Sequence, residues 1–547
     1  MTRHTRLLVM IAVAAAFGLL AACASPGPPP AVSQAGAGQE AAPASASEPA
    51  GSTEPREIVI GVGNDQFRLE GDGANLGVYP LNTNIAETLV RLTPDYQIIP
   101  WLAEKWEYVG DNTWRFYLRQ GVKFHNGDEF DAAAAKWSLE KATRWQPLIP
   151  TAPEAIVVVD KYTLELTTSV PFGRVIENLV HPSYAMYSPQ GDPGSDPIGT
   201  GPFRLDEYKQ NEFLRVVKNE EYWGDEAQLD AITFRFIPDN SARILALQSG
   251  DVDMIDPVPR DNTAQVQAMP DVQLFASQPS AYYALYFATH DQVPPYDTLT
   301  DVRLRRAINY AIDRETIVNG VYDGFAVAAK SLTPPVVFPA INQGIQGFSY
   351  DPEKARALFA EAGWSDSDGD GILDKDGQPL KLVLVSGFPP ANLIKPLPEV
   401  IQGQLKDIGV DVELKEYNDI GAYYDFIVDD GSMHMVIEGG NWNTADVSFL
   451  PYALFCGCNP EGEAILYKRF WINEKFDQAV QEAQAAVDEA AATEAAVRAA
   501  RIWVDEYTAV APIAYIPRLV AARSGIEGFQ IHPSTISQNW APLTVSE

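Results

Sequence analysis

Cysteine and histidine are scarce in this chain of 547 residues, which contains three cysteines and six histidines. The histidines, among them His125, His181, His290 and His434, are scattered singly. The sequence also lacks the G-x-S-x-G motif of serine hydrolases, the H-E-x-x-H motif of zinc proteases and the P-loop. These absences argue against an enzyme. A secreted hydrolase with paired carboxylates, as in glycosidases, stays open as the rival class.

Basic side chains are in the minority, because 40 Lys and Arg stand against 73 Asp and Glu, for a formal net charge of −33. So acidic a surface repels the phosphates of nucleic acid and of an anionic bilayer, and we expect no nucleic acid among the partners. The hydrophobic fraction of 46% is that of a globular protein, and the length allows several domains with sizeable cores.

Long apolar runs are absent except near the N-terminus, where the basic segment MTRHTR precedes the 14 apolar residues LLVMIAVAAAFGLL (7–20). This run is too short to span a bilayer comfortably and has the length of a signal-peptide core. The sequence LAAC (20–23) follows, and it resembles the lipobox of bacterial lipoproteins, where a signal peptidase cuts before a cysteine that is then acylated. We predict a signal peptide over 1–22 and a lipid on Cys23. The alternative is an ordinary secretory signal with a chance cysteine.

Aromatic residues are missing from 24–55, and Val32 is the only branched aliphatic residue there. Such a segment, rich in Pro, Ala, Ser and Gly, offers too little apolar surface to order itself. We therefore predict a disordered tether over 23–55, which spans about 30 Å root-mean-square. The folded body is expected outside the cytoplasm, lipid-anchored to the membrane, in the periplasm or on the cell surface.

Only Cys456 and Cys458 remain, in LFCGCNPEG (454–462). In an oxidising compartment they could form a small disulfide, and the alternatives are a metal clip or two free thiols. Two cysteines without a nearby third cysteine or histidine do not make a zinc site. A disulfide or free thiols are the readings that we keep.

Strand-like and helix-like segments mix along the rest of the chain, which predicts the α/β fold class. A helix is expected over 130–143, with Asp131 at its N-cap. A second is expected from Asp351, as N-cap, to Gly363, where it stops.

Six segments together resemble one protein family. They are LAEKWEYVGDNTWRFYLRQGVKFHNGDEFDAAAAKWSLEK (102–141), DPIGTGPFRLDEYKQNEFLRVVKNEEYWG (196–224), ALQSGDVDMI (246–255), DVRLRRAINYAIDRETIVNGVYDG (301–324), DPEKARALFAEAGWSDSDGDGILDKDG (351–377) and VIQGQLKDIGVDVELKE (400–416). The segments are similar to the family 5 extracellular solute-binding proteins of bacterial ABC importers, which include oligopeptide, dipeptide, nickel and oligosaccharide receptors. They stand in the family's order and span nearly all of the body, about 56–545.

The resemblance implies a two-lobed periplasmic-binding-protein fold with an extra inserted domain. The implied domains are a discontinuous domain I (56–98, 199–282 and 513–547), domain II (99–198) and domain III (283–512). Domains I and II would form one lobe and domain III the other, hinged at chain crossings near 280 and 512. The implied function is that of a monomeric receptor, not an enzyme. It would capture peptides and deliver them to ABC permease and ATPase subunits, with oligosaccharides as the alternative ligand.

The family's ligand loop is a Gly-Trp pair followed by an aspartate-rich stretch, and EGGNWNTADVSFL (438–450) occupies its place here. The resemblance implies that Asn441, Trp442 and Asp446 contact the ligand, with Asp446 as the partner of a peptide's amino terminus. This chain departs from the family because its DPDNF sequence is absent. The remaining candidates for the cavity wall are tyrosines: Tyr282, Tyr283, Tyr423 and Tyr424.

The stretch SDSDGDGILDKDG (365–377) resembles a calcium-binding loop. Asp366, Asp368, Asp370, the carbonyl of Ile372 and Asp374 match positions 1, 3, 5, 7 and 9 of such a loop. The glutamate of position 12 is missing, and a strand follows, so this is no EF-hand pair. We interpret the stretch as a peripheral hairpin turn that structural calcium could order, and we expect no other cofactor.

The lipid anchor is tested by Cys23→Ser. Without the thiol the protein should be released in soluble form or stay unprocessed, which fractionation and the mass of the N-terminus report. A variant that is processed normally and remains in the membrane would contradict the prediction.

Overall fold

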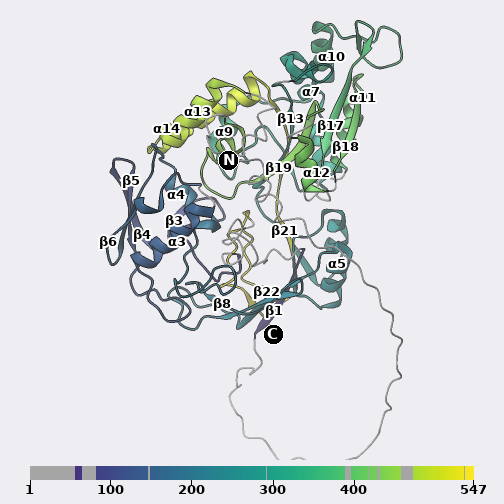
Figure 1. Ribbon diagram of the computed structural model, residues 1–547. Helices are drawn as coiled ribbons and strands as arrows, with labels where there is room; N and C mark the ends of the chain where they lie inside the picture. Colours follow the sequence, from purple (N-terminus) through teal and green to yellow (C-terminus); the bar gives the residue numbers. More distant parts are fainter. Residues whose placement is uncertain are drawn as a thin grey trace, which may run out of the picture. The chain divides into compact units, whose positions relative to one another are not determined.

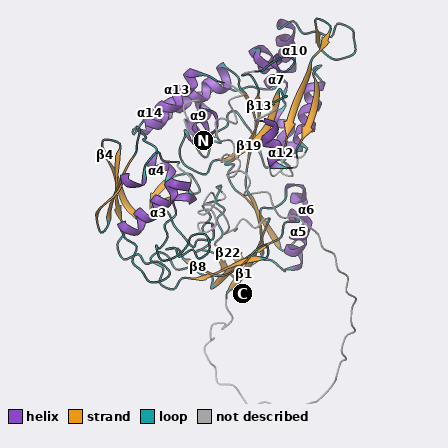
Figure 2. Ribbon diagram, viewed as in Figure 1, coloured by secondary structure: helices purple, strands orange, loops and turns teal. Residues whose placement is uncertain are grey.

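The computed structural model describes residues 56–63, 82–145, 148–290, 292–387, 396–417, 419–427, 431–456, 472–534 and 536–546. The expected signal peptide, Cys23, the expected tether and Cys458 lie outside these residues. Helices and strands mix along the described chain, which confirms the α/β class (Figure 2).

Three distant stretches of the chain meet in a seven-stranded sheet of order β12-β21-β11-β1-β10-β9-β8. Its strands are β1 (Glu57–Val62), β8 (Phe203–Lys209), β9 (Phe213–Lys218), β10 (Ala231–Phe236), β11 (Met254–Asp256), β12 (Val272–Ala276) and β21 (Leu519–Arg523). β1 is parallel to both β10 and β11. Helix α5 (Asn240–Ser249) connects β10 to β11, and α6 (Thr263–Gln267) precedes β12.

A four-stranded antiparallel sheet has the order β4-β5-β7-β6. Its strands are β4 (Ala103–Gly110), β5 (Thr113–Leu118), β6 (Ile156–Asp160) and β7 (Thr163–Thr167). Helix α3 (Ala132–Trp145) lies against β6 and β7, and α4 (Val175–Asn178) follows further along the chain (Figure 1). The Asp131 carboxylate accepts from the backbone N–H groups of Ala133 and Ala134 at 3.0 Å, which confirms the predicted N-cap.

A six-stranded sheet has the order β14-β20-β13-β19-β17-β18. Its strands are β13 (Ala281–Phe287), β14 (Val327–Ala328), β17 (Lys381–Ser386), β18 (Asp411–Glu416), β19 (Met435–Asn441) and β20 (Val510–Ile516). One face carries Leu285 and Leu384, which pack into a core with residues of α7 (Val302–Ala311), α10 (Pro352–Glu361) and α11 (Leu397–Lys406). The opposite face carries aromatic side chains that contribute to the site.

The chain passes between the seven-stranded and the six-stranded sheet at 277–280 and at 517–518. The crossing expected near 512 falls inside β20, which continues to Ile516. We refer to 56–276 with 519–546 as the first lobe, and to 281–516 as the second lobe.

The helices follow their sequence signals closely. Asp351 accepts from the N–H of Lys354 at 2.9 Å and Gly363 has a left-handed φ of +88°, which confirms the start and stop of α10. The alanine-rich segment 474–501 forms two helices, α13 (Glu474–Ala485) and α14 (Glu489–Arg501). Three two-stranded sheets pair β2 (Val90–Leu92) with β3 (Ile98–Pro100), β15 (Asp374–Lys375) with β16 (Gln378–Pro379), and β22 (Ile526–Glu527) with β23 (Thr544–Val545). The remaining described α-helices are α8 (Arg314–Gly320), α9 (Pro339–Gly344) and α12 (Ile420–Asp425).

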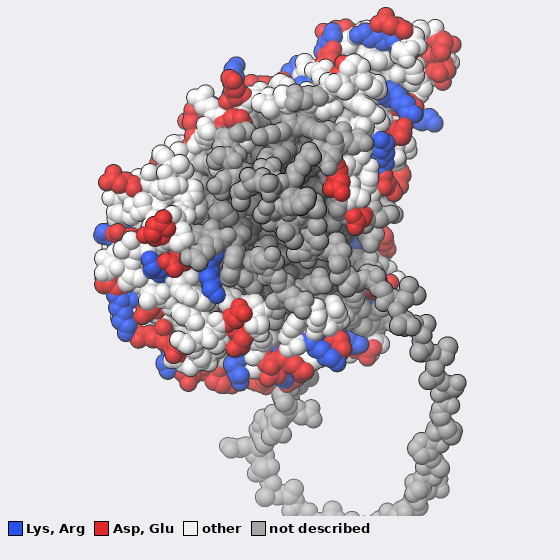
Figure 3. Space-filling view, in the orientation of Figure 1, with Lys and Arg blue, Asp and Glu red and all other residues white. Residues whose placement is uncertain are grey.

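Within the described part of the chain, no helix combines the length and the apolar character that crossing a membrane requires. Acidic and basic side chains are interspersed over the described surface in Figure 3. Cys456 is buried and disulfide-bonded, so of the two readings of this cysteine the disulfide is confirmed; its partner lies outside the described residues.

Candidate functional site

Trp442 lies just after β19 in the second lobe and is 1% exposed. Its indole Nε1 donates to the carbonyl of Leu332 at 3.0 Å, and its ring meets Phe338 edge to face, with the centroids 5.7 Å apart. Its backbone carbonyl accepts from the hydroxyl of Tyr96, in the first lobe, at 2.8 Å. The indole is thus held within the second lobe, and the backbone makes the bond to the first.

Asp446 forms a second bond between the lobes. Its Oδ2 accepts from the amide of Asn178, at the end of α4, at 2.9 Å. Its Oδ1 accepts from the N–H of Ser448 at 2.8 Å and from the Ser448 hydroxyl at 2.6 Å. Burial raises the pKa of Asp446, which these donors and the charge of Arg174 oppose. Asp446 is therefore a fully buried carboxylate whose hydrogen-bond donors are all neutral groups.

The first turn of α4 makes further contacts across the lobes. Arg174 pairs with Glu177 at 2.7 Å and donates to the carbonyl of Ala486, which follows α13, at 2.7 Å. A Cβ added to Gly173 would lie 1.9 Å from that same carbonyl oxygen, so only glycine permits this approach. Burial raises the pKa of Glu177 to about 7; Arg174 lowers it, and Asp446 and Glu489 raise it further.

An aromatic face with a buried carboxylate covers the second lobe's sheet beside these contacts. The Tyr282 hydroxyl lies 3.1 Å from that of Tyr286, and the Tyr282 ring covers Gly440, where an added Cβ would be 2.8 Å from the ring. Tyr423 donates its hydroxyl to Oε1 of Glu438 at 2.5 Å, and both side chains are buried. Glu438 was not among the predicted ligand-site residues, although it is the first residue of the segment 438–450.

Tyr283 does not join this face. Side chains alternate along a strand, so Tyr283 points to the opposite side of β13 from Tyr282. There it stacks with Tyr322 at 6.5 Å, and burial raises the pKa of Tyr283 to about 12. Asn441 is exposed at the end of β19, and the side chain of Tyr424 lies outside the described residues. The structure thus brings Trp442, Asp446 and Tyr282 to the side of the second lobe that meets the first.

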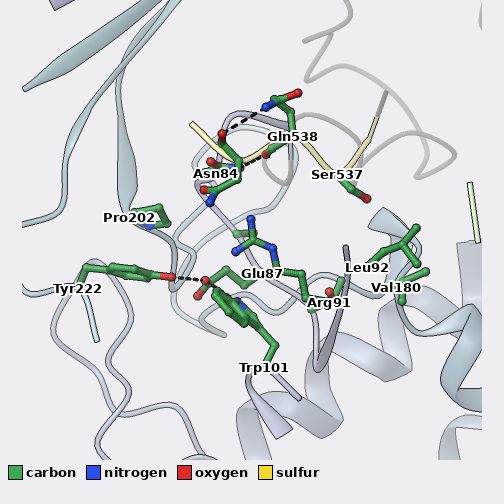
Figure 4. A pocket seen from close by; sticks show the side chains of 13 residues that line it. Asn84, Glu87, Arg91, Leu92, Trp101, Val180, Pro202, Tyr222, Ser537 and Gln538 are labelled. Atoms are coloured by element: carbon green, nitrogen blue, oxygen red, sulfur yellow. Dashed lines mark hydrogen bonds between the residues drawn. The ribbon is translucent and has the colours of Figure 1, made fainter. Parts of the chain in front are cut away.

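A pocket of about 50 Å³ lies in the first lobe (Figure 4). Glu87 on its wall is buried, and its carboxylate accepts four hydrogen bonds. The donors are the Trp101 indole (2.7 Å), the Tyr222 hydroxyl (2.7 Å), the Thr200 hydroxyl (2.8 Å) and the Trp223 indole (3.0 Å). Arg91, the other charged residue of the wall, and Glu87 were both missed from the sequence, since neither belongs to a motif of recognisable spacing.

The buried histidines are engaged by the protein. Nδ1 of His434 accepts from the N–H of Val383 at 2.9 Å, and its Nε2 lies 3.1 Å from the carbonyl of Pro295. Both ring nitrogens of His532 are also within hydrogen-bonding distance of protein groups, and burial lowers its pKa to about 4. These two imidazoles therefore have no nitrogen left for a metal ion in this structure.

The aspartate loop is exposed, in contrast to the buried contacts described above. Carboxylate oxygens of Asp366, Asp368 and Asp374 lie within 4.8 Å of one another, and that of Asp370 is not part of the cluster. Asp366 accepts from the N–H of Gly369 at 2.7 Å, and other N–H groups of the loop donate to its remaining aspartates. Three close carboxylates suit a hard cation such as calcium, which prefers oxygen ligands.

Calcium is expected to stabilise the loop without changing ligand affinity. We predict that calcium raises the Tm, by an amount equivalent to about 1–3 kcal/mol at 10–100 times Kd. Replacing Asp368 and Asp370 by Asn should lower the Tm in calcium, and a thermal melt with and without chelator measures this. A folded variant that has lost ligand binding would instead place the loop in the ligand site.

The buried Glu177 predicts a pH dependence of stability. Its pKa is raised from 4.5 to about 7, so the folded protein holds a proton that the unfolded chain releases. The free energy of unfolding should therefore fall as the pH rises from about 4.5 to about 7, by up to about 3 kcal/mol from this group. Urea unfolding at both pH values measures it, and Glu177→Gln should flatten the change. An equally steep change in that variant would assign the effect to other groups.

The chain matches the model of the bacterial extracellular solute-binding proteins, family 5 Middle, over residues 97–461. It is 33% identical over 349 residues to the nickel-binding periplasmic protein of Escherichia coli (strain K12), covering 60% of this chain and 65% of that one. It is 34% identical over 333 residues to the glutathione-binding protein GsiB of Salmonella paratyphi A, covering 57% and 62%. The chain thus spans a little less than two thirds of the length of these relatives.

Solved structures share the fold. NikA from Brucella suis in complex with Fe(III)-EDTA superimposes with a TM-score of 0.76 and 25% identity, covering 90% of this chain and all of that one. The oligopeptide-binding protein AppA from Bacillus subtilis, in complex with a nonapeptide, has a TM-score of 0.67 and 20% identity over the same shares. The predicted periplasmic-binding-protein fold is confirmed, and the chain belongs to the family 5 bacterial extracellular solute-binding proteins.

Proposed function

We propose that this protein is the extracytoplasmic receptor of an ABC importer, and that it captures peptides between its two lobes for a permease and its ATPase subunits. Membership of the family supports a receptor rather than an enzyme. The printed names of relatives include nickel and glutathione as ligands, and AppA was solved with a nonapeptide. The signal peptide, the lipid on Cys23 and the tether of 23–55 belong to the same proposal, and so does the monomeric state.

Capture follows from closure of the lobes over the ligand. The chain crosses between the sheets twice, at 277–280 and 517–518, and a double crossing of this kind suits a hinge. A ligand that contacts both lobes favours the closed form by the difference between its affinities for the two forms. The seven-, four- and six-stranded sheets support the proposed division into domains I, II and III.

The observation that carries the peptide proposal is the environment of Asp446. Among the described residues, this buried carboxylate receives only neutral donors, and its Oδ2 accepts a single hydrogen bond, from Asn178. A carboxylate oxygen has room for a second donor, and a buried carboxylate gains most from a cationic one. The ammonium of a peptide is such a donor, whereas an oligosaccharide carries no positive charge. The engaged imidazoles of His434 and His532 give a bare nickel ion little to bind.

Asp446→Asn distinguishes peptide from sugar. For a peptide the change leaves the ammonium without a counter-charge and should weaken binding by about 2–5 kcal/mol. For a sugar it should cost about one hydrogen bond, 0.5–1.5 kcal/mol, and Trp442→Ala should cost more. Calorimetric titration with a tripeptide and with a trisaccharide measures both.

Asn178→Ala is the matched control, because it removes the bond between the lobes and keeps the carboxylate of Asp446. The peptide proposal requires that Asp446→Asn weaken peptide binding clearly more than Asn178→Ala does. Equal losses would mean that Asp446 only joins the lobes, and unchanged binding in Asp446→Asn would remove it from the ligand site.

A further inference from the structure

Arg91 carries a positive charge that the described protein does not use for hydrogen bonding. It lies in β2, next to Leu92, and its guanidinium points into the pocket of Figure 4. The guanidinium carbon stands 4.5 Å from the centroid of the Trp101 ring, so the indole fixes the side chain from one side. Among the described residues, no acceptor receives a hydrogen bond from Arg91.

The nearby carboxylate does not satisfy Arg91. Glu87 attracts it electrostatically, but no oxygen of Glu87 lies within salt-bridge distance, and both oxygens are occupied by the four donors described above. Arg91 is half-buried, and burial lowers its pKa. A desolvated guanidinium with free donors is a strong partner for an anion.

The other free polar groups of the pocket can also donate. The hydroxyl of Ser537 has no partner among the described residues. The side-chain oxygen of Asn539 accepts from the N–H of Ala541 at 3.3 Å, while its amide nitrogen donates to no described group. By contrast, the side-chain amides of Asn84 and Gln538 donate to and accept from other protein groups. The wall therefore offers hydrogen-bond donors to an occupant.

The pocket has room for a small functional group. Its volume is about 50 Å³, and a water molecule takes about 30 Å³ of liquid. A carboxylate fits this space and matches the fork of a guanidinium with two parallel hydrogen bonds.

The pocket adjoins the contacts between the lobes. Val180 on its wall stands two residues after Asn178, which bonds to Asp446. The carbonyl of Leu92, also on the wall, lies 3.2 Å from Nε2 of His532. The ring of His532 packs against Tyr96, whose hydroxyl donates to the backbone carbonyl of Trp442. These contacts link the wall of the pocket to residues that bond between the lobes.

We infer that Arg91, with Ser537 and Asn539, forms a subsite for a carboxylate of the captured ligand. The inference rests on the proposed function, since it assigns the acidic end of the same peptide. Asp446 in the second lobe would face the ammonium and Arg91 in the first lobe the carboxylate. A zwitterionic ligand would then bridge the two lobes.

The test compares tri-alanine with tri-alanine amide, by calorimetric titration of the full-length protein. The wild type should bind the free acid about 10- to 100-fold more tightly than the amide, the range for hydrogen bonds to charged groups. Arg91→Gln should remove that preference. Arg119→Gln is the matched control, because Arg119 also covers an indole, that of Trp223, at 4.7 Å, but spends donors on the carbonyl of Trp101 and on Glu104. It should keep the preference.

An acid-over-amide preference that survives in Arg91→Gln would overturn the subsite and leave the peptide proposal standing. So would equal affinities for acid and amide in the wild type. If the wild type binds neither tripeptide, the peptide proposal fails for this probe, and acetate against chloride at equal ionic strength then tests the subsite alone. Acetate should raise the Tm of the wild type and of Arg119→Gln but not of Arg91→Gln, and a rise that does not depend on Arg91 would overturn the inference.

Discussion

The hydrogen bond from Asn178 to Asp446 is one of several described contacts between the two lobes, which the chain also joins at 277–280 and 517–518. It places a carboxylate in a fully buried position, where a charge is costly unless donors surround it. The hydrogen bond from Arg174 to the carbonyl of Ala486 and the close approach at Gly173 hold α4 against the second lobe. The arrangement of the lobes is thus tied to how one buried charge is satisfied.

That dependence connects structure to ligand capture. Among the described residues, Asp446 has only neutral donors and Arg91 has no acceptor, so the first gains from a cation and the second from an anion. The two groups belong to different lobes, so a ligand with both charges interacts best when the lobes are together. Differential affinity of this kind is what a receptor needs in order to present a loaded form to a membrane partner.

Much of the fold could be predicted from the sequence because its signals are local. The N-caps Asp131 and Asp351 and the stop at Gly363 act within a few residues. The site was less accessible, because its geometry depends on segments hundreds of residues apart. The sequence loop pointed to Trp442 and Asp446, but it could not show that Asn178 bonds to Asp446. The sequence also does not reveal that Tyr282 and Tyr283 lie on opposite faces of β13, or that Arg91 has no acceptor among the described residues. Both facts depend on the three-dimensional positions of strands and lobes.

The identity of the carried ligand tests the account most directly. The receptor can be purified without added ligand, denatured, and the released small molecules identified by mass spectrometry. The account predicts short peptides with a free amino terminus and a free carboxylate. Release of oligosaccharides or of a metal chelate, with no peptide, would contradict it.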